Sequence, residues 1–156
     1  KENHNKDFLT VGGMGHASQI ALGIALNKKN QNIVCLDGDG SMIMHMGSFA
    51  INASSKANNF KHIIFNNAAH DSVGGQPTVA DRINIQKIID GLGYKWSSVA
   101  QSKNQIIKAI KEMNKVSGPA FLEIQVKKGN RENLGRPTIE PKNNKKDFMK
   151  FLDKNE

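Results

Sequence analysis

Two apolar runs, each followed directly by polar residues, are separated by a stretch long enough for one helix. Residues 33–36 are apolar and β-branched, which favours a buried strand, and they lead into the acidic, glycine-rich residues 37–40. Residues 62–65 form the second run and lead into two asparagines at 66–67. A strand, a helix and a second strand in this order favour a parallel pair, which places both polar turns at the same edge of a sheet. The pattern predicts an α/β fold with a ligand site at that edge.

The stretch between the two runs predicts a helix that begins near Ser41. A serine at this position can cap the first turn of a helix, and the positive end of the helix dipole favours a phosphate beside the glycine turn. The apolar side chains expected to face the core are those of Met42, Met44, Met46, Phe49 and Ala50.

The two turns have the chemistry of a site for a metal ion and a phosphate group. Gly38 and Gly40 allow backbone N–H groups to approach a bulky anion, and Asp39 offers a short carboxylate. Asn67 offers an amide oxygen and Ala69 a main-chain carbonyl, and Mg²⁺ that is also bound to phosphate prefers such oxygen ligands. The alternative is a glycine turn with a helix-capping aspartate, followed by an asparagine-rich turn. The pairing of two such turns across a helical spacer favours the metal site.

A second glycine-rich turn lies near the start of the chain. Residues 8–11 predict a short strand, and Gly12, Gly13 and Met14 then precede a helix over residues 17–26. Two interpretations of this turn remain open. Either the glycines make a tight connection with Met14 in the core, or the backbone lines a ligand with Met14 as its apolar support.

The later segments continue the alternation of strands and helices. Helices are predicted over residues 84–93 and from Ser102 or Asn104 onward, and strands over residues 94–99 and 120–126. We therefore expect a doubly wound parallel sheet with helices on both faces.

The 156-residue chain is long enough for one domain with a substantial core. We expect residues 8–141 to form this domain, after a linker remnant at 1–7. Residues 142–156 carry apolar side chains at helical spacing, which predicts a short amphipathic helix that docks on a partner domain or subunit.

The chain is basic, with 22 lysines and arginines against 14 acidic residues and a formal net charge of +8. Binding to nucleic acid is one interpretation of this charge. A solvated, lysine-rich surface is the better one, because no aromatic residues interleave with the lysines. Such a field would also favour an anionic substrate.

The single cysteine, Cys35, lies in a predicted central strand, where it would act as a small buried side chain in a reducing compartment. The sequence shows no signal-peptide pattern and no apolar run of membrane-spanning length. We therefore expect a cytoplasmic protein that does not bind membranes.

The GDG turn at 38–40 and the NN pair at 66–67, with the spacer between them, resemble the signature of thiamine diphosphate enzymes. The resemblance implies that Asp39, the Asn67 side chain and the Ala69 carbonyl bind Mg²⁺. It also implies that Met14 supports a bent cofactor. The cofactor-binding residues that it implies are Gly12, Gly13, Met14, Gly38, Gly40, Ser41 and Met42.

Four segments together resemble one group within this family, the phosphonopyruvate decarboxylases, which convert 3-phosphonopyruvate to phosphonoacetaldehyde and CO₂ in phosphonate biosynthesis. The segments are GGMGHAS at 12–18, LDGDGSMIMHMGS at 36–48, NNAAHDSVGGQPT at 66–78 and NLGRPT at 133–138. The sulfopyruvate decarboxylase β subunit, which has this domain as a separate chain, is the alternative within the same chemistry.

His70 and Asp71 are the catalytic candidates in the longest of these segments. His70 would donate to a substrate oxyanion or shuttle a proton, unless the loop backbone simply holds it. Asp71 would orient His70 or cap the turn. Ala68 departs from the glycine expected after the two asparagines, and a positive φ there would cost an alanine of order 1 kcal/mol. Arg131 and Arg136 suit a phosphonate group, or else lie on a solvated tail.

Cofactor activation in this family requires a glutamate from a separate pyrimidine-binding domain, and the glutamates of this chain lie in no matching motif. The resemblance therefore implies a pyrimidine-binding domain or subunit as partner, an anionic 2-oxo acid as substrate and an oligomer. A function of another class, a non-catalytic module that binds phosphate or nucleotide through the GDG turn, would not bind thiamine diphosphate in a Mg²⁺-dependent way.

Overall fold

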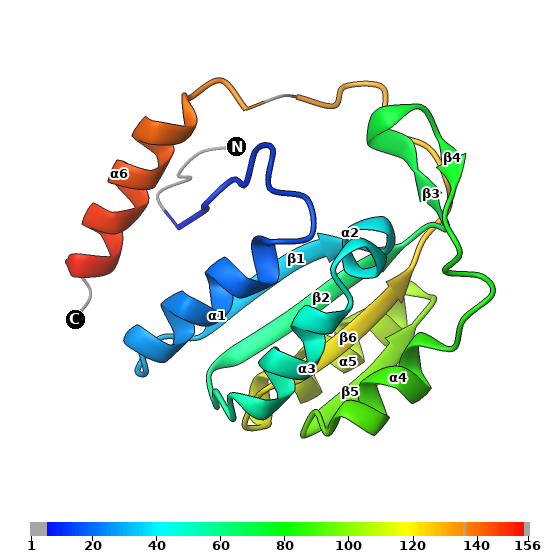
Figure 1. Cartoon of the computed structure of the whole chain (residues 1–156), viewed down its shortest axis with the longest axis horizontal. Coiled ribbons are helices and arrows are strands. Elements are labelled where there is room, and N and C mark those ends of the chain that lie inside the picture. The colour runs from blue at the N-terminus through cyan, green and yellow to red at the C-terminus, as the bar shows by residue number, and fades with distance from the viewer. Residues whose placement is uncertain (1–5, 136, 155–156) are drawn as a thin grey trace.

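The computed structural model describes residues 6–135 and 137–154 of the chain. Within these residues, four parallel strands form one sheet in the order β1-β2-β6-β5 (Figure 1). The strands are β1 (Ile33–Gly38), β2 (Phe60–Asn66), β5 (Trp96–Ala100) and β6 (Ala120–Gln125). A small antiparallel ribbon of β3 (Ala69–His70) and β4 (Gln76–Pro77) follows β2, with a 3₁₀ turn at Asp71–Val73 between its strands.

Helices cover both faces of the sheet, as the alternation of elements predicts. They are α1 (Ala17–Asn27), α2 (Asp39–Met44), α3 (Gly47–Ser54), α4 (Ile85–Leu92), α5 (Lys103–Lys115) and α6 (Pro141–Asp153). Helices α1, α3 and α4 pack on one face and α5 on the other (Figure 1). The doubly wound α/β prediction is therefore confirmed.

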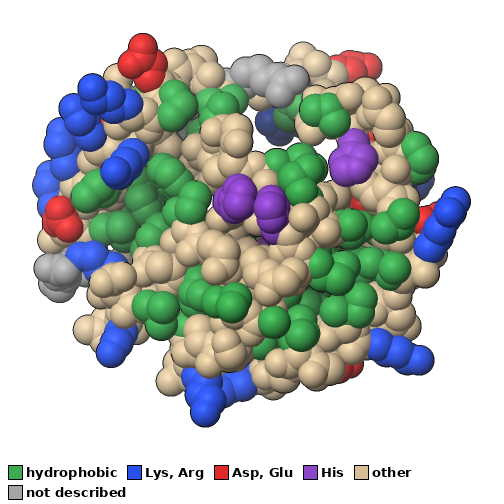
Figure 2. Space-filling view, viewed as in Figure 1, with side chains coloured by type: hydrophobic (Ala, Val, Ile, Leu, Met, Phe, Trp, Pro, Cys, Tyr) green, Lys and Arg blue, Asp and Glu red, His purple; other side chains and the backbone are tan. Residues whose placement is uncertain are grey.

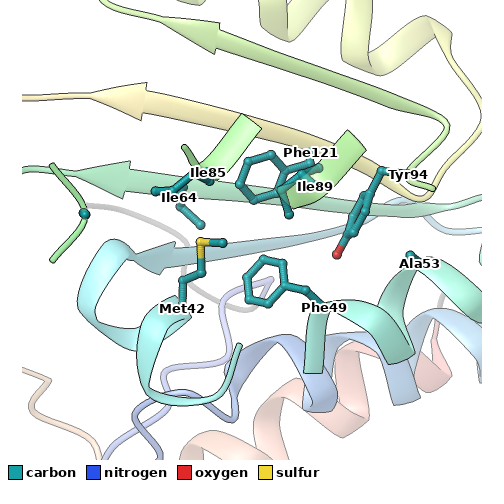
Figure 3. Packing of buried hydrophobic residues seen from close by; sticks show 9 residues of the cluster. Met42, Phe49, Ala53, Ile64, Ile85, Ile89, Tyr94 and Phe121 are labelled. Atoms are coloured by element: carbon teal, nitrogen blue, oxygen red, sulfur yellow. The ribbon is translucent and has the colours of Figure 1, made fainter. Parts of the chain in front are cut away.

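Each face of the sheet has its own core, because successive side chains of a strand point to opposite faces. Ile64 and Phe121 belong to the core under α3 and α4, whereas Ile63 and Leu122 belong to the core under α5. Figure 3 shows the first of these cores, in which the ring of Phe49 and the side chain of Met42 face the sheet. This packing fixes the register of the strands and so the positions of the turns that follow them.

Two local predictions about the N-terminal half are wrong. Residues 8–11 do not form a strand, and the single helix expected after Ser41 is two helices, α2 and α3, separated at His45. Gly38 rather than Ser41 occupies the N-cap position of α2. Of the five side chains expected to face the core, those of Met42 and Phe49 are buried, whereas Met44 and Ala50 are exposed.

The caps of the later helices can be assigned from the structure. Asn84 caps α4 through a bond from the Lys87 N–H to its side chain, and Gly93 ends the helix in the left-handed region. Ser102, not Asn104, caps α5 and forms a capping box with Gln105. These contacts satisfy N–H groups of the first helical turn that have no partner within the helix.

The C-terminal helix α6 packs against the N-terminal segment of its own chain. The rings of Phe8 and Phe148 lie 5.7 Å apart, and the Asn144 side chain accepts a hydrogen bond from the Leu9 N–H and donates one to the Asp7 carbonyl. Lys28, at the C-cap position of α1, also pairs with Asp153 at 3.6 Å. The helix expected to dock on a partner thus finds contacts within the chain. Across the described ranges, none of the helices combines the length and the apolar character needed to cross a membrane.

Candidate functional site

The parallel register of β1 and β2 brings the two predicted turns to the same end of the sheet. Gly38, the last residue of β1, lies opposite Phe65, which directly precedes the two asparagines. Asp39 begins α2 immediately after β1 and is only 1% exposed. The residues of the two predicted turns therefore lie together at the carboxyl edge of the strands, where ligands bind in parallel sheets.

Thr78 connects the two turns, although the sequence analysis assigned it no role. Its hydroxyl donates to Oδ2 of Asp39 at 2.5 Å, and its backbone N–H donates to the carbonyl of Ala68 at 3.1 Å. Thr78 thus binds both Asp39, in the first turn, and Ala68, which follows Asn67 in the second turn. The only signal in the sequence was the position of Thr78 at the end of the segment NNAAHDSVGGQPT.

Asp71 orients Asn67, whereas the sequence analysis expected it to orient His70 or to cap the turn. The Asn67 side-chain nitrogen donates to Oδ2 of Asp71 at 2.7 Å, and its Oδ1 accepts a hydrogen bond from the Ala69 N–H at 3.1 Å. The same Asp71 oxygen also accepts a bond from the Gly129 N–H at 2.7 Å. These bonds direct the amide nitrogen of Asn67 to Asp71 and leave one lone pair of its oxygen available for a cation.

Ala68 has a positive φ of 52°, in the left-handed region. The departure from glycine at this position therefore carries the backbone cost that the sequence analysis anticipated. The carbonyl of Ala68 is nevertheless bound by Thr78, and the following Ala69 is buried in β3, opposite Pro77 of β4. The turn that positions Asn67 and Ala69 therefore forms with alanine at position 68.

The N-terminal glycine turn lies against α2. The Gly15 N–H donates to the Ser41 hydroxyl at 2.7 Å, so this buried serine joins the two glycine turns. Gly12 has a φ of 74°, which a side chain rarely adopts. Gly13 is half-buried, and a Cβ there would lie 2.6 Å from the side chain of Thr10.

Gly40, His70 and Met14 come together beside the GDG turn. A Cβ on Gly40 would lie 2.5 Å from Cε1 of His70 and 3.4 Å from Cε of Met14, so the imidazole fits only because residue 40 has no side chain. Met14 is 39% exposed and is not a core residue, which favours the ligand-lining interpretation of its turn. Three predicted residues from separate segments therefore face one space.

Gly38 and Met42 differ in what they can offer to a ligand. A Cβ on Gly38 would meet nothing within 4 Å, so the backbone there is open to a bound group. Met42 is 1% exposed and packs in the core with Phe49 and Ile64 (Figure 3). Any contact from Met42 to a ligand must therefore come from its main chain.

Next to the GDG turn, a buried polar cluster is formed by Cys35, Asp37 and His62. The cysteine sulfur, a carboxylate oxygen and an imidazole nitrogen of the cluster lie within 4.8 Å of one another. Burial, together with the charge of Asp37, raises the pKa of Cys35 to about 12 and keeps the thiol protonated. Burial alone would raise the pKa of Asp37, but the nearby imidazole of His62, whose Nε2 lies 3.7 Å from Oδ2, and the hydroxyl of Ser41 bring that pKa below its ordinary value. Asp37 thus supports the start of α2 as a carboxylate.

Histidine side chains are visible on the face of the molecule that Figure 2 shows. The rings of His16 and His45 lie 4.3 Å apart, and His45 packs against Gly15. The sequence analysis did not select these two histidines, because they belong to separate turns and no spacing pattern joins them. Their rings border the same GGMG turn that carries Met14.

A cavity of about 690 Å³ lies past the ends of β2 and β6. Its lining includes Asn66, Asn67, Arg82 and Glu123, and the Asn66 side chain donates to Glu123 at 2.7 Å. The cavity is polar and directly adjoins the asparagine turn. Arg131 is exposed, and Arg136 lies outside the described residues.

Replacing Asp71 with alanine should loosen the segment that follows β6. The variant loses the acceptor for the Gly129 N–H, and a hydrogen bond to a carboxylate contributes about 1.5–3 kcal/mol. Trypsin should then cleave after Lys127 or Lys128 about tenfold faster, as mass spectrometry of timed digests would measure. Asp81→Ala, at an exposed position, is the matched control. Equal cleavage rates in the two variants would contradict this role of Asp71.

Ala68→Gly should stabilise the protein, because glycine adopts a positive φ without the steric cost. The gain in the free energy of unfolding should be at most about 1 kcal/mol, since glycine also increases the entropy of the unfolded chain. The same change at the exposed Ala50 of α3 should instead destabilise by about 1 kcal/mol. Urea unfolding of both variants measures the difference, and the prediction fails if both lose stability equally.

Comparison with known proteins identifies the family of the chain. Residues 2–124 match the family model described as "Thiamine pyrophosphate enzyme, C-terminal TPP binding domain". The chain is 31% identical over 150 residues to a phosphonopyruvate decarboxylase of Streptomyces hygroscopicus, covering 96% of this chain and 37% of the relative. It is also 31% identical over 125 residues to sulfopyruvate decarboxylase subunit beta of Methanothermobacter thermautotrophicus, covering 80% of this chain and 64% of the relative.

Solved structures show the same fold. The thiamine diphosphate-dependent 4-hydroxybenzoylformate decarboxylase of Rhodococcus jostii RHA1 matches with a TM-score of 0.65 and 19% identity, covering 77% of this chain and 24% of that one. The chain thus spans less than two thirds of the length of each of these relatives. With the family model matched over most of its length, the chain belongs to the thiamine pyrophosphate enzymes and carries their C-terminal, TPP-binding domain.

Proposed function

We propose that this chain is the diphosphate-binding half of a thiamine diphosphate-dependent decarboxylase that converts 3-phosphonopyruvate to phosphonoacetaldehyde and CO₂. The observation that carries the proposal is the unit at the carboxyl edge of the sheet in which Thr78 hydrogen bonds to Asp39 and to the Ala68 carbonyl, and in which the Ala69 N–H hydrogen bonds to Asn67. This unit gathers a carboxylate, an amide oxygen and main-chain carbonyls, which is the donor set that Mg²⁺ prefers.

The residues present fit a magnesium–diphosphate group. Asp39, the Asn67 oxygen and the Ala69 carbonyl would hold the metal, and the open backbone at Gly38 leaves room for the diphosphate. Gly40 and the adjacent main chain at the start of α2 would contribute further contacts. Met14, which is partly exposed beside Gly40, would support the cofactor on its apolar side.

Thiamine diphosphate, when bound, supplies a nucleophilic carbon that adds to the 2-oxo group and takes up the electron pair released with CO₂. His70 would serve the substrate from the adjoining ribbon. Its imidazole lies against Gly40, next to the space assigned to the cofactor, where it could hydrogen bond to the substrate oxygen and supply a proton. Asp71 would act on Asn67 rather than on the substrate.

The complete enzyme would include a pyrimidine-binding domain or subunit. The phosphonopyruvate decarboxylase relative is more than twice as long as the matched region. One face of β1 and β2 also exposes Val34, Leu36 and Phe65, which are 47%, 61% and 40% exposed, and apolar side chains grouped in this way favour burial against a further part of the protein. The single buried thiol of Cys35 supports a reducing compartment such as the cytoplasm.

A sulfopyruvate decarboxylase β subunit remains the second candidate, because a relative of that name has the same 31% identity as the phosphonopyruvate decarboxylase, over 125 rather than 150 residues. Both substrates are 2-oxo acids with a strongly anionic group. The AHDSVGGQPT segment favours phosphonopyruvate, by its resemblance to phosphonopyruvate decarboxylases.

Asp39→Ala should abolish Mg²⁺-dependent binding of thiamine diphosphate. Because removal of a group that merely orients a ligand costs about 10–100-fold in metal affinity, loss of the carboxylate itself should cost at least about 100-fold. Titration calorimetry with thiamine diphosphate, with and without Mg²⁺, measures this, and Asp147→Ala, at an exposed position of α6, is the control. Binding that is independent of both Mg²⁺ and Asp39 would indicate a non-catalytic phosphate-binding module instead.

Activity should require the partner, and the two substrates should differ. The chain alone should release little CO₂, whereas the chain purified with its accompanying pyrimidine-binding polypeptide should release it faster from 3-phosphonopyruvate than from sulfopyruvate. Rapid turnover by the isolated chain would contradict the need for a partner. A preference for sulfopyruvate would assign the chain to the second candidate.

A further inference from the structure

We infer that Cys35, Asp37 and His62 form a binding site for Zn²⁺ in the core, on the face of the sheet that α1 and α3 cover. None of the three residues is among the ligands proposed above for Mg²⁺ or for thiamine diphosphate. The inference therefore goes beyond the proposed function and does not rest on it. Zn²⁺ in this position would join β1 to β2 next to the GDG turn.

The three side chains leave two paired strands on the same face of the sheet. Cys35 of β1 lies opposite His62 of β2, and Asp37 follows Cys35 by two residues along β1. Nε2 of His62 lies 3.7 Å from Oδ2 of Asp37, and one ligand atom from each of the three residues fits within 4.8 Å. Two ligands of a tetrahedral Zn²⁺ lie roughly 3.3–3.8 Å apart, as bonds of about 2.0–2.3 Å require. Side-chain shifts of about 1 Å would therefore complete the geometry.

His62 is independent evidence that the cluster binds a ligand. Its side chain is fully buried, and within the part of the chain that the structure describes neither ring nitrogen has a hydrogen-bond partner. The imidazole is otherwise enclosed by the rings of Phe49, Phe60 and Phe121, which have no lone pairs to offer it. A buried polar group without a partner costs free energy, so a ligand for His62 would stabilise the fold.

The donor atoms and their total charge select the metal ion. Mg²⁺ and Ca²⁺ bind oxygen, whereas a cysteine sulfur and an imidazole nitrogen are common ligands of Zn²⁺. A thiolate, a carboxylate and a neutral imidazole together balance the two positive charges of Zn²⁺. The occupied site would thus carry no net charge, which is the condition for burying ions at low cost.

Zn²⁺ binding would change the state of the Cys35 thiol. Burial and the charge of Asp37 raise the pKa of Cys35, so without a metal the sulfur carries a proton. A Zn²⁺ ion between the thiol and the carboxylate reverses both effects and lowers the pKa of a coordinated thiol. The S–H bond would be replaced by an S–Zn bond, and the proton would be released to solvent.

The single cysteine of the chain allows a specific spectroscopic test. Protein purified through a tag on this chain, with any polypeptide that accompanies it, is freed of metal by dialysis against a chelator and titrated with Co²⁺. Co²⁺ occupies zinc sites and absorbs strongly in the near ultraviolet when it is bound to a thiolate. Wild-type protein should develop this absorption, and added Zn²⁺ should remove it by displacing Co²⁺. Competition with a fluorescent chelator then gives the Kd for Zn²⁺.

Three variants assign the metal to the cluster. Cys35→Ala should abolish the Co²⁺ absorption, and His62→Leu should raise the Kd for Zn²⁺ at least about 100-fold, since loss of a ligand costs more than loss of a group that orients one. His45→Ala disrupts the exposed His16–His45 pair, which is the competing histidine cluster, and should change neither readout. Thermal unfolding without metal shows whether each variant is folded. Zn²⁺ should raise the Tm of wild-type protein and of His45→Ala but not of Cys35→Ala.

The outcomes separate this inference from the proposed function. If folded wild-type protein shows no Co²⁺–thiolate absorption, or if Cys35→Ala keeps it, the zinc site is overturned. Asp39→Ala should lose Mg²⁺-dependent binding of thiamine diphosphate and keep the absorption. Loss of the absorption in that variant would place the metal at the GDG turn and would also overturn the zinc site. Wild-type protein that shows the absorption but does not bind thiamine diphosphate would overturn the proposed function alone.

Discussion

The parallel pairing of β1 with β2 is the constraint on which the site depends. Gly38 lies opposite Phe65, so the residues that follow the two strands emerge at the same edge of the sheet. A slip of one residue would turn Cys35 and Ile64 away from the cores that they now occupy, and the burial of those cores therefore fixes the register. The packing of apolar side chains between the sheet and its helices therefore determines where the two polar turns meet.

The elements most fully predicted from the sequence are those whose burial is regular. Residues 120–126 and 84–93 have clear periodicity, and they form β6 and α4 within a residue or two of the expected bounds. The failures occur where a distant contact decides the local structure. Residues 8–11 contact α6 through Phe8 and Leu9 rather than pairing as a strand. The helix after the GDG turn is interrupted at His45, whose ring packs against Gly15.

The same limit applies to the site. The residue types at 39, 67 and 69 could be chosen from the sequence, because strand ends and oxygen ligands are local features. The partners of those residues could not. Thr78 binds Asp39 across 39 positions, and Gly129 binds Asp71 across 58. No spacing pattern predicts a bond of that separation, so the sequence suggested that Asp71 would orient its neighbour His70, whereas the fold directs it to Asn67.

These long-range bonds make the ribbon that carries His70 and the predicted metal site a single unit. Thr78 ties one end of the ribbon to Asp39, and Asp71 ties the other end to Asn67. Gly40 completes the unit, because its missing side chain gives the His70 ring its place beside the start of α2. A glycine at this position therefore meets a packing requirement of the ribbon, in addition to the anion-binding role that the sequence predicts for the turn. Any side chain at position 40 would displace His70 even if the predicted metal ligands were unchanged, so the glycine of this turn is required by the ribbon as well as by the proposed cofactor site.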